Sequence, residues 1–110
     1  MQHWLYLSVA IVMEVAGTTS MKLSQGFANP IASAAIFVCY GISFWALTHA
    51  LTRIEVGIAY AIWAGVGTAL IAVIGIVFFR EGVSLLKLVS LGAIVLGVVG
   101  LNLAQGSLVR

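Results

Sequence analysis

Four apolar runs dominate the sequence and restrict the solvent in which the chain can fold. We place them at residues 4–21, 31–52, 57–79 and 85–105. A helix of about 20 apolar residues crosses the hydrocarbon core of a bilayer. With 63% hydrophobic and 7% charged residues, the chain has too little polar surface to cover a water-soluble domain of 110 residues. We therefore expect an all-α integral membrane protein, a single domain over residues 1–110 with four transmembrane helices.

The segments between the runs are short, so neighbouring spans are expected to be antiparallel. The first run contains a glutamate and has no basic segment before it, which favours a retained span over a cleaved signal peptide. The single cysteine, Cys39, lies in an apolar run, which excludes a disulfide or thiol–metal framework within one chain. We expect no metal, no cofactor and no nucleic-acid partner.

The basic residues direct insertion only weakly. An even number of spans places Arg53 and Arg110 on one side, and Lys22, Arg80 and Lys87 on the other. So small a bias permits insertion in both orientations. Two copies would then pack antiparallel about an axis in the membrane plane, as in inverted-repeat transporters. A protein with one fixed orientation fits the same charges equally well.

Glu14 is the only acidic residue in the four runs. A carboxylate at mid-membrane costs roughly 2.5–3.5 kcal/mol on insertion scales, so it persists only when protonated, paired or facing a polar cavity. Ala10, Gly17 and Thr18 share its helical face, which predicts free space around the carboxyl group. The Thr18 hydroxyl has three available partners, namely the carboxyl group, a water molecule or its own i−4 carbonyl. We predict that Glu14 is the working group of this protein.

Aromatic and polar side chains recur at helical spacing in the second and third runs. Tyr60 and Trp63 are one turn apart and are suited to hold a flat or cationic guest by stacking and cation–π attraction, roughly 0.5–2 kcal/mol each. Packing within the helix bundle is the alternative role. Gly65 and Gly67 in the third run permit either a helix bend or close helix contact.

The fourth run carries a continuous line of small residues on one face, Ser90, Ala93, Gly97, Gly100 and Ala104. Small residues let membrane helices approach closely, so this face is predicted to mediate association. One chain of four helices encloses little volume. A site for a drug-sized guest would therefore need a second copy.

Several stretches together identify a family resemblance. Residues 10–22 (AIVMEVAGTTSMK), 39–45 (CYGISFW) and 57–67 (GIAYAIWAGVG), with the glycine-containing fourth run, resemble the small multidrug resistance family over essentially the whole chain. The resemblance implies an antiparallel homodimer in the bacterial plasma (inner) membrane that exports toxic organic cations in exchange for protons.

The resemblance also implies residue roles. It places the membrane carboxylate at Glu14 and the aromatic stacking residues at Tyr60 and Trp63. Further substrate contacts would come from Ala10, Gly17, Thr18, Tyr40 and Ser43, and dimer contacts from the helix containing Gly97.

Three positions refine this comparison. The guanidinium-exporting branch typically has Trp where this chain has Ala16, so the chain resembles the quaternary-ammonium branch. Ser90 occupies a place where the family usually has Gly, and a small residue is kept there. Glu55 stands where related proteins often have Pro, and we interpret it as a solvated charge at the membrane edge.

The expected mechanism is competition at one charge. Two Glu14 carboxyl groups would face one cavity of the dimer, where protons and a cation compete, and a conformational swap between subunits would give alternating access without ATP. The alternatives are a guanidinium exporter of the same fold, one subunit of a paired heterodimeric exporter, and a membrane scaffold or accessory protein. An enzyme is not expected, because no second catalytic group accompanies Glu14 within a span.

Overall fold

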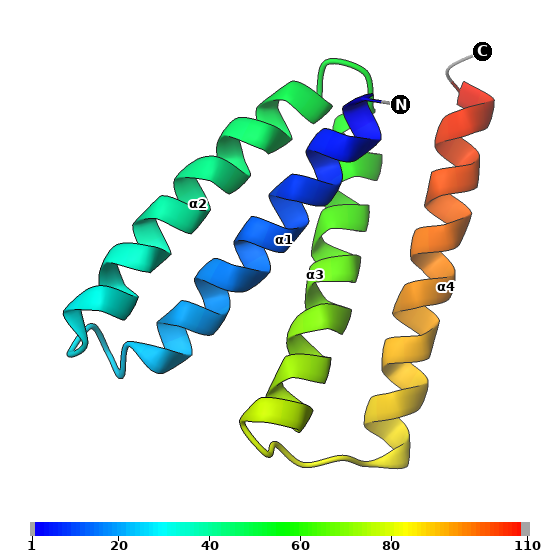
Figure 1. Cartoon of the computed structure of the whole chain (residues 1–110). Coiled ribbons are helices and arrows are strands. Elements are labelled where there is room, and N and C mark those ends of the chain that lie inside the picture. The colour runs from blue at the N-terminus through cyan, green and yellow to red at the C-terminus, as the bar shows by residue number, and fades with distance from the viewer. Residues whose placement is uncertain (1, 109–110) are drawn as a thin grey trace. The chain divides into compact units, whose positions relative to one another are not determined.

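The computed structural model describes residues 2–108, and the side chains of residues 2–106. This part of the chain forms four helices, α1 (Gln2–Leu23), α2 (Pro30–Ala50), α3 (Val56–Phe78) and α4 (Leu85–Leu108) (Figure 1). All four are long and apolar enough to cross a membrane, which confirms the prediction of an all-α protein with four spans. Arg110, one of the basic residues counted for membrane orientation, lies outside the described residues.

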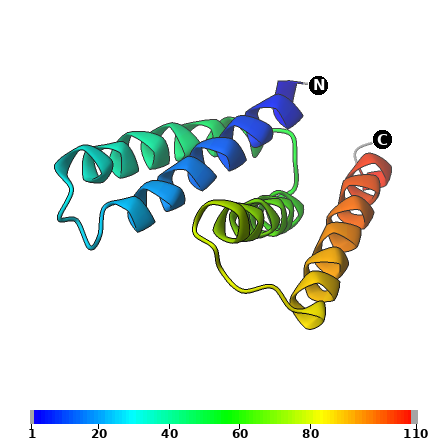
Figure 2. The ribbon, with the colours of Figure 1, turned by 60° about the horizontal axis from the view of Figure 1, so that its bottom comes forward.

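The helices form two compact units that are described separately. One unit contains α1 and α2 and ends at Arg53, and the other begins at Ile54 and contains α3 and α4. In each unit a short connection joins two antiparallel helices, which lie side by side in both views (Figures 1 and 2). This matches the short connections read from the sequence.

Helix α1 packs on α2 through small and aliphatic side chains. The buried residues are Leu7, Ala10, Ile11, Val15 and Gly17 from α1, and Ile36, Ser43, Ala46 and Ala50 from α2. A polar contact also joins the buried faces, because the Ser43 hydroxyl donates to the Ala10 carbonyl over 2.6 Å. Small residues and an interhelical hydrogen bond are the usual means of joining helices in lipid, where burial of apolar surface provides little driving force.

The turn between α1 and α2 is organised by Ser24, which is buried. Its hydroxyl donates to the Met21 carbonyl and accepts from the Phe27 amide, and its carbonyl accepts from the Asn29 amide. Gly26 has φ +70°, a conformation that glycine adopts without steric cost. Asn29 then caps α2 by accepting from two amides, with Pro30 in the first turn.

Helices α3 and α4 pack closely at Gly65. A Cβ built on Gly65 would lie 2.7 Å from Val98 Cγ2 and 3.2 Å from Ile94 Cγ2, so a side chain there would force the two helices apart. Helix α3 runs without interruption through Gly65 and Gly67. Gly65 is therefore a close-packing position, and a bend of α3 at Gly65 or Gly67 stays a prediction.

Two further contacts close this unit at its ends. The Glu55 amide donates to Oε1 of Gln105, a buried side chain that joins the start of α3 to the end of α4. At the other end, the Glu81 amide donates to the Gly75 carbonyl, and the Glu81 carboxylate lies against Gly75, where a Cβ would collide with it. The Glu55 side chain itself is exposed, as its sequence interpretation anticipates.

Candidate functional site

The Glu14 carboxyl group lies in a hydrogen-bonded chain of three side chains. Thr18 Oγ1 is 3.1 Å from Glu14 Oε1, one turn along α1. The same hydroxyl is 2.6 Å from the Tyr40 hydroxyl of α2. All three side chains are half-buried. Of the three partners that the sequence allowed for Thr18, the structure therefore selects the carboxyl group and adds Tyr40.

The direction of this chain depends on the proton at Glu14. An ionised carboxylate only accepts hydrogen bonds, and a threonine hydroxyl has a single proton to give. When Glu14 is ionised, Thr18 must therefore donate to Glu14, and Tyr40 must donate to Thr18. The arrangement satisfies one carboxylate oxygen inside an apolar span without a second charge.

Gly17 leaves space for the Tyr40 ring to lie against α1. A Cβ built on Gly17 would lie 2.9 Å from two carbons of the Tyr40 ring and 3.3 Å from Cys39 Cβ. The free space that the sequence predicted beside Glu14 is thus occupied, on the Gly17 side, by the Tyr40 ring. Glycine is needed here because the ring lies directly on the backbone of α1.

Ala10 and Ser43, also predicted as substrate contacts, lie together inside the α1–α2 interface. Both are fully buried, at 0% exposure, and the Ser43 hydroxyl is already engaged by the Ala10 carbonyl. In this arrangement they join the helices that carry Glu14 and Tyr40. Direct contact of either residue with a substrate stays a prediction.

Tyr60 and Trp63 belong to the α3–α4 unit. Their ring centroids are 5.4 Å apart with an interplanar angle of 37°, and Tyr60 is 60% exposed. Adjoining rings with one exposed member present an aromatic surface that an organic cation can contact. The two aromatic side chains that were predicted to hold a substrate are therefore neighbours in the structure. Their contact with a substrate stays a prediction.

The line of small residues on α4 lies outside the contact with α3 at Gly65. Ile94 and Val98 contact Gly65 of α3, whereas Ser90, Ala93, Gly97 and Gly100 are exposed. A Cβ built on Gly97 or Gly100 meets no atom within 4 Å. Helix α4 therefore has two different faces, one against α3 and one made of exposed small residues.

The sequence suggested no binding role for His3, His49 or Arg53, which lie close together at one end of the α1–α2 unit. A signal was available, since both histidines of the chain stand near an end of a span. Only the pairing of α1 with α2 brings them together.

Comparison with known proteins identifies relatives over most of the chain. Residues 2–94 match the family model described as Small Multidrug Resistance protein. The chain is 50% identical over 103 residues to the uncharacterized membrane protein YvaE of Bacillus subtilis (strain 168), covering 94% of this chain and 87% of YvaE.

Several other relatives have names that state a function. The chain is 41% identical over 103 residues to the quaternary ammonium compound-resistance protein QacF of Klebsiella aerogenes, covering 94% of each chain. It is 42% identical over 107 residues to the multidrug transporter EmrE of Escherichia coli (strain K12), covering 97% of each chain.

Proposed function

This chain belongs to the small multidrug resistance family, and from that membership we propose that it exports quaternary ammonium and polyaromatic cations in exchange for protons. The family is one of transporters, so the chain is not an enzyme, as predicted. Its four spans and its bacterial relatives confirm a multi-pass protein of the bacterial plasma membrane. The names of QacF and EmrE support the choice of substrate class.

One observation carries the proposal, namely the Glu14 carboxyl group held by Thr18 and Tyr40 inside a span. A negative charge in an apolar environment attracts an organic cation strongly, because little water competes for it. The same group binds a proton. Cation and proton therefore exclude each other, which is the requirement for exchange.

Protonation of Glu14 would reverse the direction of the hydrogen bonds in this chain of side chains. In the ionised state, Tyr40 donates to Thr18 and Thr18 donates to Glu14. A protonated Glu14 can donate to Thr18 instead, and Thr18 then donates to Tyr40. The Tyr40 proton must in that case turn to another acceptor, and Met21 Sδ lies 4.0 Å from its hydroxyl oxygen. We propose that α2 senses the protonation of α1 by this reversal.

Replacing Thr18 with valine is expected to weaken tetraphenylphosphonium binding by about 10-fold, the equivalent of the ~1.5 kcal/mol of a hydrogen bond to a charged group. The change keeps the shape of the side chain and removes both hydrogen bonds of its hydroxyl. Thr19→Val is the matched control, because the Thr19 hydroxyl donates to the Val15 carbonyl of its own helix. If titration calorimetry gives both variants the same affinity for tetraphenylphosphonium, Thr18 does not contribute to cation binding.

Association of two copies is proposed to use the exposed small-residue face of α4. The support is that this face is distinct from the one packed on α3, and that the basic residues give little preference for one orientation. Reporters fused to the C-terminus, one active in the cytoplasm and one outside it, should both give signal. Signal from a single reporter would contradict dual insertion and favour one fixed orientation or a partner chain.

Transport is tested with the purified protein in liposomes. An acidic interior should drive uptake of a quaternary ammonium compound, and the uptake should collapse when an ionophore removes the pH gradient. Folded protein that moves guanidinium but no quaternary ammonium would replace this proposal with the guanidinium exporter. Folded protein that binds and moves neither would favour a scaffold or accessory role.

A further inference from the structure

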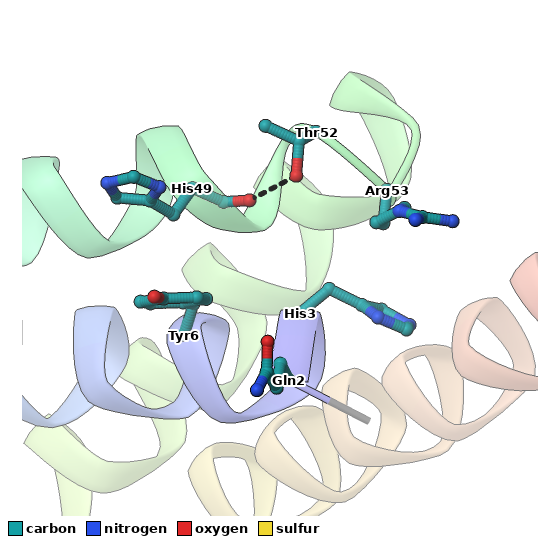
Figure 3. A pocket seen from close by; sticks show the side chains of 6 residues that line it. All are labelled: Gln2, His3, Tyr6, His49, Thr52 and Arg53. Atoms are coloured by element: carbon teal, nitrogen blue, oxygen red, sulfur yellow. Dashed lines mark hydrogen bonds between the residues drawn. The ribbon is translucent and has the colours of Figure 1, made fainter.

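A second polar site lies at one end of the α1–α2 unit, apart from Glu14. It is a pocket of about 600 Å³ lined by Gln2, His3, Tyr6, His49, Thr52 and Arg53 (Figure 3). This volume falls within the ~300–1,000 Å³ that is usual for ligand pockets. The lining comes from the first two turns of α1, the last turn of α2 and the two residues at the end of the unit. None of the six lining residues is acidic.

The charge of this pocket has one sign. Arg53 is permanently cationic, and both histidines of the chain line the pocket with it. Figure 3 shows the His3 and Arg53 side chains extending in the same direction. Guanidinium, imidazole and amide N–H groups all donate hydrogen bonds, so the pocket offers donors and positive charge to an anion.

The aromatic residues keep one side of the pocket in place. The Tyr6 ring stacks on His49 at a centroid distance of 5.0 Å and an interplanar angle of 23° (Figure 3). Trp45 meets His49 edge-on at 4.7 Å. The Thr52 hydroxyl donates to the His49 carbonyl over 2.7 Å, which closes the end of α2. His49 is thus oriented by contacts on both sides of its ring and at its backbone.

An apolar stripe continues from this pocket along α2. Going back from His49 in steps of one helical turn, the residues are Trp45, Ile42 and Val38, which are 57%, 40% and 60% exposed. The polar pocket lies at one end of two spans, at the level where lipid headgroups meet the hydrocarbon core, and the stripe runs from there toward the middle of the span. This combination matches a molecule with a phosphate at one end and acyl chains at the other.

We infer that this pocket binds the headgroup phosphate of an anionic phospholipid, with Arg53 and His3 on the phosphate and an acyl chain along Trp45, Ile42 and Val38. Basic pockets between membrane helices hold anionic headgroups by this chemistry. Free phosphate offers the same oxygens but lacks the acyl chain. The inference concerns a different site from Glu14 and holds whether or not the chain exports cations.

Native mass spectrometry of the full-length protein tests the assignment, with phosphatidylglycerol and phosphatidylcholine of equal chain length as probes. The wild type should retain phosphatidylglycerol in preference to phosphatidylcholine, also in excess inorganic phosphate. Arg53→Gln should lower this retention about five-fold, the factor that corresponds to ~1 kcal/mol per basic residue near anionic lipid. Arg53→Lys should keep most of it, because the charge remains.

Lys22→Gln is the matched control, since it removes one positive charge at the opposite end of α1. An equal loss in this variant would show diffuse surface charge and overturn the pocket. So would equal retention of the two lipids, or unchanged retention in Arg53→Gln. If inorganic phosphate displaces the lipid, the ligand of the pocket is free phosphate and the lipid assignment is overturned. Gel filtration and circular dichroism confirm that each variant is folded.

Discussion

Glu14→Gln is expected to abolish tetraphenylphosphonium binding and proton-driven uptake. Glutamine keeps the size of the side chain and still accepts a hydrogen bond from Thr18, but it carries no charge and exchanges no proton. Removing one partner of a desolvated charge pair costs about 2–5 kcal/mol, which corresponds to roughly 30-fold or more in Kd. Titration calorimetry across a range of pH measures the loss.

The pH dependence of the wild type gives this experiment a second readout. If cation and proton compete for Glu14, wild-type affinity rises with pH, and Glu14→Gln shows no such rise. Glu55→Gln is the control, because the Glu55 side chain is exposed and stands just before α3. Proton-coupled uptake that survives in Glu14→Gln would refute the assignment of the coupling residue.

Gly17→Ala is expected to destabilise the protein and to weaken cation binding at the same time. The new methyl group would lie 2.9 Å from the Tyr40 ring, so the ring must move, and overpacking of this kind costs about 1–3 kcal/mol. A displaced Tyr40 loses its 2.6 Å hydrogen bond to Thr18. We expect a lower midpoint of thermal unfolding in detergent and a several-fold higher Kd for tetraphenylphosphonium.

Gly41→Ala separates this clash from the general effect of replacing a helical glycine. Both substitutions gain helix propensity, up to about 1 kcal/mol, but a Cβ on Gly41 meets no atom within 4 Å. Gly41→Ala should therefore leave stability and binding unchanged or improved. If the two alanine variants behave alike, Gly17 does not hold Tyr40 against α1.

Only part of the candidate site in the α1–α2 unit could be predicted from the sequence. Glu14 could be singled out because its charge within an apolar run is visible without any structure. The partners of Thr18 could not be narrowed below three, and Tyr40, which is none of those three, stands 22 positions away on another helix. Likewise, the face with Ala10 and Gly17 was expected to border free space, whereas α2 covers both residues.

Other contacts could not be predicted either, because the sequence does not show how one helix lies against the next. Nothing in the sequence distinguishes Gly65, which packs on Val98, from a glycine that bends a helix. Nor does it bring His3 and Arg53 into one pocket, because they stand far apart in the sequence, at the start of α1 and just after α2. These features require the register at which one helix lies against the next.

The sequence by itself determined the number of spans, the short connections and the position of the one acidic residue within them. Each of these follows from local composition, because the length and apolarity of a segment decide whether it crosses a bilayer. Only the tertiary structure decided that Tyr40 completes the hydrogen-bonded chain of Glu14. A helix in lipid is apolar on nearly all faces, so its pattern of hydrophobic residues does not specify which face meets its neighbour. That choice is made by close contacts such as Gly17 against Tyr40 and Ser43 against the Ala10 carbonyl.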